Sequence, residues 1–384
     1  MILVAYEWHK LVGVRALWAF VVLCLVYNVF LVGMNNLGRD FFNDTSADAH
    51  LLGQRVDQAF LEGLAALPST EHREVLLAAA RGMENTYATY DTAELATYYG
   101  EKVTRDPLAV SLVNWKYELL QPQVTHLAAT EAAMDVYVGP ATHDSHWFLF
   151  GTLFETVVGE GALAGMLVML FLVGHESQQR TDQVLYATKV GRGLVVRKVV
   201  AGMVAAVTLY VVLAVVSLAF YFALWDYGGV WDANVSSQFN YVVEGFFAKP
   251  FLTWTDFSVA GFTAAVVALG AALVAVCALL AAACGLLVRK VYAAALLLAA
   301  MLMGALVVRS ALAEVGLWML SFAFGFAPTS VWVSLPVWFT EMGLSAALPW
   351  QETIAVAFNA VLLTAACGLA LRRFARKDVA PWNS

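Results

Sequence analysis

Six long apolar runs restrict the possible folds of this chain more than any other feature. They cover residues 16–34, 148–173, 199–224, 257–288, 291–310 and 350–371. An α-helix needs about 20 predominantly apolar residues to cross the hydrocarbon core of a bilayer. A helix also satisfies its own backbone hydrogen bonds, which lipid cannot do. The sequence therefore predicts an all-α polytopic membrane protein with six transmembrane helices.

Composition supports this prediction. Hydrophobic residues make up 61% of the 384 residues and charged residues only 13%, a balance that would leave large apolar patches on a water-soluble protein. The net charge of -7 argues against nucleic acid as a partner, because phosphate binding needs a concentrated basic surface. All four cysteines lie in apolar runs, so neither a disulfide framework nor a zinc site is predicted.

The first apolar run could instead be a secretory signal peptide. A small-residue cleavage pattern should then follow, and the residues after the run, Gly33-Met34-Asn35-Asn36, offer none. A first membrane span at 16–34 is therefore the favoured interpretation.

The basic residues predict the orientation. On the six-span map, most Lys and Arg residues outside the large polar segment fall on one side of the membrane. The positive-inside rule makes this side cytoplasmic. We therefore expect a multi-pass plasma membrane protein, bacterial in type, with both termini and a tail at 372–384 in the cytoplasm. The segment 35–147 is then outside, with 16 Asp and Glu against 7 Lys and Arg.

The outer segments differ in their patterns. Residues 35–147 read as a helical extracytoplasmic domain, in which Leu108, Leu112, Trp115 and Leu119 repeat at helical spacing. Residues 225–256 form a shorter outer loop. Within 311–349, prolines interrupt two apolar stretches, which favours two short re-entrant or interfacial helices on the outer side. A seventh full span is the alternative, but it would place the basic tail outside.

Two segments on the cytoplasmic side have amphipathic character. Residues 1–15 predict a helix on the membrane surface with Glu7 and Lys10 toward water, or else an inward continuation of the first span. The basic loop 174–198 predicts a short helix that docks on a soluble partner, or else a loop that only sets topology.

These segments together resemble the permease subunits of ABC transporters of the ABC-2 type, a class of exporters with six spans per subunit. The resemblance covers essentially the whole chain. It begins with the pattern Glu7-Trp8-His9-Lys10-Leu11, which is similar to the family's elbow helix. After the second span come a Glu, a leucine-containing stretch, a Thr-x-x-Gly-Arg motif and a Lys. The matching positions are Glu176, Leu185, Thr188, Gly191, Arg192 and Lys198.

The resemblance implies that 174–198 is the coupling loop that contacts an ABC ATPase. The residues expected to couple the two subunits are then Glu7, Lys10, Glu176, Thr181, Leu185, Thr188, Gly191, Arg192 and Lys198. It further implies that a second permease, the same or a sister chain, completes the transporter. The large outer domain departs from the shortest family members, which leaves the substrate of this chain open.

Catalysis within this chain is not predicted. The sequence holds no Gly-x-x-x-x-Gly-Lys-Ser/Thr loop, so ATP and Mg²⁺ are expected on the partner ATPase, and no cofactor or catalytic residue is assigned here. His143 and His146 beside Asp144 have metal-ligand spacing, but a polar turn at the membrane interface is favoured over a metal site.

Polar residues inside the spans are candidates for a substrate path. They are Glu155, Glu160, Asn28 and Asn359. Glu155 could instead lie at headgroup level. The sequence thus predicts a permease for a hydrophobic or cationic substrate such as a peptide, lipid or drug. The alternative is a non-transporting membrane sensor or scaffold whose outer domain binds a ligand.

Overall fold

The predicted all-α membrane fold is confirmed. The computed structural model describes residues 2–136, 140–179, 191–244, 247–288 and 290–376. Among these residues, six helices are long and apolar enough to cross a membrane. They belong to α2 (Arg15–Met34), α9 (Glu155–Gln178), α11 (Gly191–Leu224), α12 (Val259–Leu287), α13 (Val291–Glu314) and α16 (Gln351–Arg376).

The second span is longer than the sequence predicts. A short helix α8 (Pro140–Trp147) and a π-helical stretch (Phe148–Phe154) run directly into α9. They give one helical segment of 35 residues, Thr142–Glu176. At 1.5 Å per residue this segment measures about 52 Å, well beyond a hydrocarbon core of about 30 Å. The predicted start at residue 148 therefore misses part of the helix, which projects into the polar region beyond the spans.

Helix α9 forms the centre of the bundle and packs against α11 and α12. Glycines make this packing close: a Cβ atom on Gly165 would lie 2.7 Å from the Cβ of Ala206, and one on Gly161 would lie 2.9 Å from Tyr210. Small residues at such positions allow helix backbones to approach each other in a membrane. The spans α2, α13 and α16 lie at the periphery, with only a small share of their residues buried, so much of their apolar surface is available to lipid.

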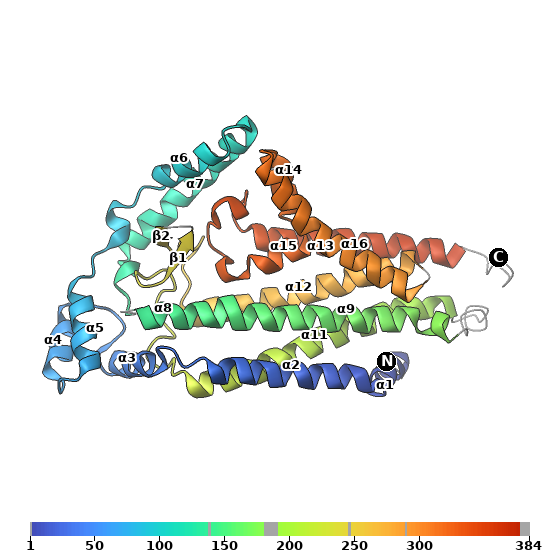
Figure 1. The fold of residues 1–384 in the computed structure, drawn as a ribbon, viewed down its shortest axis with the longest axis horizontal. Coiled ribbons are helices and arrows are strands. Elements are labelled where there is room, and N and C mark those ends of the chain that lie inside the picture. Colours follow the sequence, from blue (N-terminus) through green and yellow to red (C-terminus); the bar gives the residue numbers. More distant parts are fainter. Residues whose placement is uncertain (1, 137–139, 180–190, 245–246, 289, 377–384) are drawn as a thin grey trace.

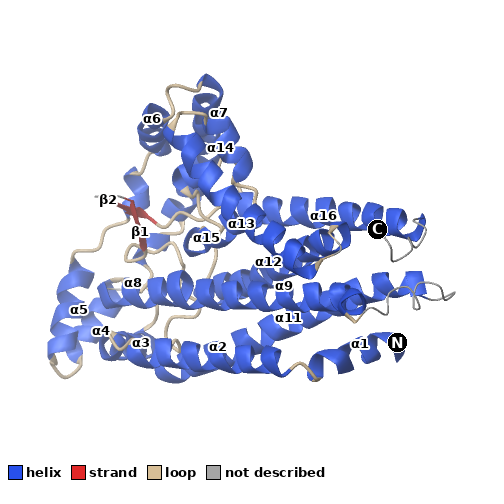
Figure 2. Cartoon of the chain, turned by 45° about the vertical axis from the view of Figure 1, so that its right-hand side comes forward, coloured by secondary structure: helices blue, strands red, loops and turns tan. Residues whose placement is uncertain are grey.

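Most of the remaining chain forms a structure at one end of the bundle. We call it the cap and define it as residues 35–136, 225–244, 247–258 and 334–350. Its helices are α3 (Arg39–Leu52), α4 (Gln58–Ala66), α5 (Glu71–Arg81), α6 (Thr92–Lys102) and α7 (Pro107–Ala129). Two strands, β1 (Tyr241–Glu244) and β2 (Phe247–Pro250), pair antiparallel within it, as Figure 2 shows.

Local sequence explains where the cap helices begin. The side chains of Asp57, Thr70, Asp91 and Asp106 each accept a hydrogen bond from a backbone N–H in the first turn of α4, α5, α6 and α7. Such N-caps satisfy donors that have no partner inside the helix. Pro107 occupies the first position of α7, where a backbone N–H would have no partner within the helix, so its lack of an N–H costs no hydrogen bond.

Between α13 and the cap lie two short helices, α14 (Trp318–Phe324) and α15 (Pro328–Val333). They fall in the segment for which the sequence predicts two short helices. With seven and six residues, neither is long enough to cross a bilayer. Single helical turns occur at Thr86–Thr89, Ala132–Met134, Leu335–Val337 and Gly343–Ser345.

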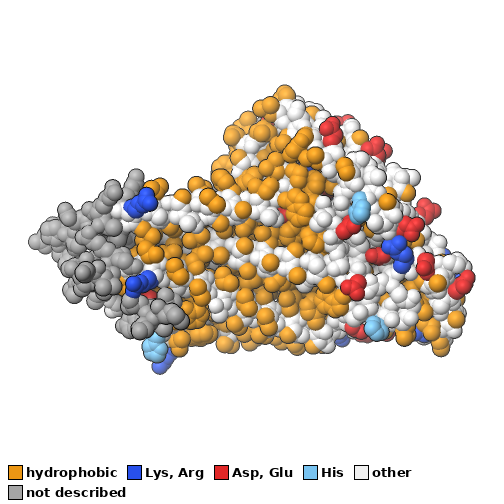
Figure 3. Space-filling model, turned by 180° about the vertical axis from the view of Figure 1, so that it is seen from behind, with side chains coloured by type: hydrophobic (Ala, Val, Ile, Leu, Met, Phe, Trp, Pro, Cys, Tyr) orange, Lys and Arg blue, Asp and Glu red, His pale blue; other side chains and the backbone are white. Residues whose placement is uncertain are grey.

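The two ends of the bundle differ in character. Helix α1 (Ile2–Val12) and the final turns of α16 lie at one end, which we call the terminal end, and the cap lies at the other (Figure 1). On the face seen in Figure 3, hydrophobic side chains cover the spans, while acidic side chains gather toward the cap. Both described chain ends therefore lie on the same side, as an even number of spans requires.

Candidate functional site

A cluster of four charged side chains joins three helices at the terminal end. Lys10 of α1 places its Nζ atom 3.0 Å from Glu7 Oε1 and 3.2 Å from Glu176 Oε1 of α9. Lys198 of α11 forms a close ion pair with Glu176 and donates a hydrogen bond of 2.9 Å to the carbonyl of Leu172. We call Glu7, Lys10, Glu176 and Lys198 the charge cluster.

The charge cluster is buried and balanced. The side chains of Glu7, Glu176 and Lys198 are at most 6% exposed, and Lys10 is 17% exposed. Two carboxylates therefore face two ammonium groups away from water. Removing one member of such a group leaves an uncompensated buried charge, which is strongly destabilising. The cluster thus holds the ends of α1, α9 and α11 together, on both sides of the 180–190 segment.

Four of the predicted coupling residues therefore meet, although the sequence separates Lys10 and Glu176 by 166 positions. Gly191 and Arg192 are the first residues of α11, and their side chains lie outside the described part of the structure. Thr181, Leu185 and Thr188 also lie outside the described residues. Their predicted contact with an ATPase stays a prediction.

A second group of polar side chains lies within the spans. The Nδ2 atom of Asn28 in α2 donates to Glu160 Oε2 of α9 at 2.8 Å and to Ser217 Oγ of α11 at 3.1 Å. We call Asn28, Glu160 and Ser217 the polar triad. Asn28 and Ser217 are buried and Glu160 is half-buried. The polar triad thus joins α9 and α11, which also carry the charge cluster, to α2, which follows α1.

The other two predicted path residues lie elsewhere. At Glu155, the backbone carbonyl accepts a hydrogen bond of 2.8 Å from the indole of Trp332. The amide of Asn359 donates to the carbonyls of Phe326 and Ala355, at 2.7 and 2.8 Å. Asn359 therefore satisfies a carbonyl near the end of α14, which is a structural role. The predicted path residues do not form one group, because only Asn28 and Glu160 meet.

The cap contains a buried polar network that the sequence does not reveal. Lys116 of α7 donates to three backbone carbonyls, those of Glu341, Gly343 and Ala346, at 3.0, 2.6 and 3.0 Å. This arrangement uses all three donors of the ammonium group. Burial lowers the pKa of Lys116 to about 8, against the opposing attraction of the Glu341 carboxylate.

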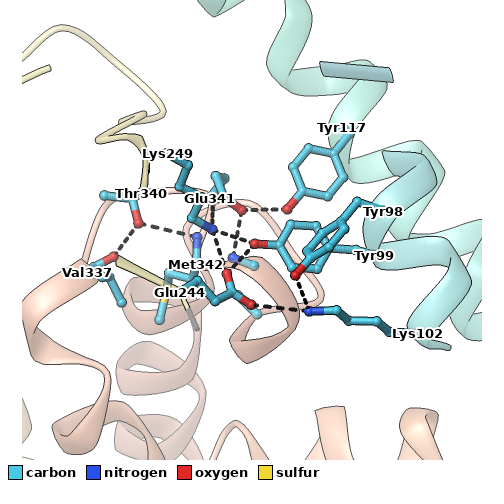
Figure 4. A network of polar contacts seen from close by, with 12 residues as sticks. Tyr98, Tyr99, Lys102, Tyr117, Glu244, Lys249, Val337, Thr340, Glu341 and Met342 are labelled. Carbon is cyan, nitrogen blue, oxygen red and sulfur yellow. Dashed lines mark hydrogen bonds and ion pairs between the residues drawn. The ribbon is translucent and has the colours of Figure 1, made fainter. Parts of the chain in front are cut away.

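Glu341 is the acidic centre of this network (Figure 4). It forms an ion pair with Lys249 of β2, and its Oε2 accepts from the Tyr117 hydroxyl and the Gly343 N–H, both at 2.6 Å. Burial alone would raise its pKa. The cations of Lys249 and Lys116 and these hydrogen bonds outweigh burial and hold the pKa of Glu341 below its ordinary value.

The rim of the network connects β1 to α6. Lys249 also donates to the Tyr99 hydroxyl at 2.7 Å and pairs with Glu244 at 3.1 Å, and Tyr99 donates to Glu244. Burial, reinforced by Glu341, raises the pKa of Tyr99, so its hydroxyl keeps its proton. We call Tyr99, Lys116, Tyr117, Glu244, Lys249 and Glu341 the cap network. It ties the segment leading into α16 to helices that precede the second span.

The two histidines with metal-ligand spacing contact aromatic rings. His143 stacks on Tyr241 with ring centroids 3.7 Å apart, and His146 lies near Phe150 and Tyr227. Within the described ranges, no three His, Cys, Asp or Glu side chains come together in a way that could hold a metal ion. Both histidines thus belong to the packing between α8 and the cap.

Sequence reasoning missed Ser217 and the cap network. A single Ser in an apolar run carries no distinctive signal, because its hydroxyl commonly bonds to its own helix. Lys116 does carry a signal: it lies on the buried face of α7 with Val113, Leu120 and Val124. A lysine within an apolar helical stripe indicates a buried, satisfied cation.

The fold and these sites define a class: an all-α polytopic membrane protein with linked helix ends on one side, a cap on the other and a polar triad between them. Comparisons with protein-family models, with curated proteins and with solved structures find no match for this chain.

Proposed function

We propose that this chain is the permease subunit of an ATP-driven exporter of the ABC-2 type. The charge cluster is the observation that supports this proposal best. A soluble ATPase that moves the 180–190 segment would act on the ends of α9 and α11 on either side of it. Because Glu176 and Lys198 pair, these two ends would move together, and Lys10 would carry the motion to α1.

The proposed mechanism uses rigid helices. Helix α1 leads directly into α2, so a displacement at the cluster reaches all three helices of the polar triad. In this mechanism the terminal end is cytoplasmic and the cap lies outside. ATP and Mg²⁺ bind to the partner ATPase, and a second permease, identical or related, completes the path. ATP binding by the partner supplies the differential interaction that shifts the spans between two states.

A test requires the permease reconstituted with the ATPase that purifies with it. Lys198→Met should reduce the permease-dependent ATP hydrolysis rate at least about tenfold, since the link between α9 and α11 loses its cation. Lys198→Arg keeps the charge and should retain much of the rate. Arg197→Met, at the adjacent exposed position, is the matched control and should leave the rate near that of the wild type.

Loss of folding must be separated from loss of coupling. Each variant is therefore compared by size-exclusion chromatography and thermal unfolding before the hydrolysis assay. A folded Lys198→Met complex with an unchanged ATP hydrolysis rate would remove the proposed role of the cluster. Failure to recover any ATP-binding subunit with the wild-type chain would contradict the proposed function itself.

A further inference from the structure

The polar triad lies within the spans, in the part nearer the cap: Asn28 is six positions before Met34, the last residue of α2, and Ser217 is seven positions before Leu224, the last residue of α11. Glu160 precedes Glu176 by 16 positions, or about 24 Å of helix. Asn28 follows Arg15, the first residue of α2, by 13 positions, or about 20 Å. Both residues are thus far from the terminal end of a hydrocarbon core of about 30 Å. Ionisable groups at such a depth normally face a partner, a cavity or a ligand.

The carboxylate of Glu160 accepts a hydrogen bond but pairs with no cation among the described residues. The donor is the neutral amide of Asn28, at 2.8 Å. Among the residues that the structure describes, no Lys, Arg or His pairs with Glu160. Within the described residues, an ionised Glu160 therefore has no cation to balance its charge.

The orientation of the Asn28 amide fits an ionised carboxylate. Its NH2 group faces Glu160 and Ser217, whereas the reverse orientation would set an amide oxygen against a carboxylate oxygen. The remaining atom, Asn28 Oδ1, is buried, and within the described part of the chain no donor reaches it. A buried acceptor without a donor destabilises the protein, so this position requires a hydrogen-bond donor.

The site therefore lacks two partners: a positive charge for Glu160 and a hydrogen-bond donor for Asn28. We propose that the polar triad binds the ammonium group of an amphiphilic primary amine, which reaches half-buried Glu160 from the lipid-facing side of the bundle. An alkylammonium group carries one charge and three N–H donors, so it meets both needs. Its hydrocarbon tail stays in contact with the apolar surfaces of the spans.

Other occupants satisfy the site less completely. A proton on Glu160 would neutralise the charge but give no donor to Asn28 Oδ1. A divalent metal ion normally takes six or more oxygen ligands or several His, Cys and carboxylate side chains, which the described residues do not bring together. The claim that such an amine is transported rests on the proposed function. The claim that it binds at the polar triad does not depend on any ATPase.

Thermal unfolding of the purified chain in phosphatidylcholine nanodiscs tests the proposal without an ATPase. Dodecylammonium chloride should raise the unfolding midpoint of the wild type by roughly 3 °C or more at saturation. Dodecyltrimethylammonium has the charge but no N–H donor, so its shift should be smaller. Dodecanol has the tail without the charge and should give no specific shift.

Two variants show whether the shift in the unfolding midpoint depends on Glu160. Glu160→Gln should abolish the dodecylammonium shift, because the site loses its charge but keeps its shape. Glu352→Gln is the matched control: it neutralises another buried carboxylate, at the start of α16, and should keep the full shift. Both variants are first checked for folding without amine.

Two outcomes would overturn the proposal. Equal shifts for the wild type and Glu160→Gln would show that the amine acts through the lipid. No shift in the wild type, with an infrared carboxylic acid band at pH 7 that Glu160→Gln removes, would show that a proton occupies the site. Neither outcome bears on recovery of an ATP-binding subunit, so failure of this inference and failure of the proposed function remain distinguishable.

Discussion

The ammonium group of Lys116 shows how one side chain can hold together distant parts of the chain. It contacts carbonyls more than 220 positions away and fixes the turn that leads into α16. Lys116→Met should lower the free energy of unfolding by about 3 kcal/mol, since three buried carbonyls lose their donor. Chemical denaturation in detergent measures this change.

The matched control for Lys116→Met is Lys102→Met, which removes a partly exposed lysine from the neighbouring helix α6. Its ion pair with Glu244 spans 4.0 Å, and such exposed pairs contribute less than about 1 kcal/mol. Equal losses for the two variants would mean that the carbonyl contacts of Lys116 are not specifically stabilising.

Glu341 gives the cap network a predictable dependence on pH. Its pKa is lowered in the folded protein, so its stabilising contribution is complete above the unfolded pKa of about 4.3. That contribution is lost as the pH falls through the lower folded pKa. The titratable groups around Glu341 are Lys249, Lys116, Tyr117, Tyr99 and Tyr90, and Glu244 pairs with Lys249.

Glu341→Gln should therefore cost about 3 kcal/mol of unfolding free energy at pH 7, because Lys249 keeps a buried charge without its main partner. The difference from the wild type should shrink below about pH 4. Thermal unfolding across pH 3 to 8 measures it. A difference that stays constant over this range would show that the ionised carboxylate is not what stabilises the cap.

At the scale of single residues, the sequence reveals a candidate only where its neighbours in the sequence make it unusual. Glu160 and Asn28 stand out because a polar side chain inside an apolar run needs an explanation. The four members of the charge cluster stand out only through a family resemblance, which does not predict that their side chains meet in space. The cap network could not be predicted, since Lys116 finds its carbonyls 225 to 230 positions away.

At the scale of elements, glycines determine how closely the spans pack. Gly165→Val should lower the free energy of unfolding by about 1–3 kcal/mol, because its side chain would meet Ala206 of α11. Gly304→Val in α13 is the control, since a Cβ there meets nothing within 4 Å. It should change the stability by less than about 0.5 kcal/mol.

Thermal unfolding in detergent compares the two glycine variants. A loss of stability of similar size in Gly304→Val would show that the effect at Gly165 comes from replacing glycine by valine in a helix, not from the contact with α11. A stable Gly165→Val protein would mean that α9 and α11 are less closely packed than the structure indicates.

The existence of the helices and some of their starting points were predictable, but the buried face of a helix was not. The apolar spans follow directly from length and hydropathy, and the N-caps of α6 and α7 follow from Asp91 and Asp106. The repeat at Leu108, Trp115 and Leu119 correctly predicts α7, yet these side chains are exposed. The buried face is the neighbouring one, because contacts with α6 and the 334–350 segment decide which stripe is covered.

At the scale of the whole molecule, the charge cluster and the polar triad share α9 and α11, and the cap network lies on other elements. The charge cluster, the polar triad and the cap network each tie together segments that are distant in the sequence. A sensor or scaffold would need the cap to bind a ligand, but it would not need an ATPase at the terminal end. That difference separates the two hypotheses experimentally.

The most direct test places a photo-crosslinking amino acid at Gln179, the exposed residue that directly follows α9, in the chain expressed in its native membrane. A matched probe at exposed Glu62 in the cap serves as control. The account predicts that Gln179 crosslinks to a subunit that 8-azido-ATP labels, and that Glu62 does not. An ATP-binding adduct only at Glu62, or none at either position, would contradict the account.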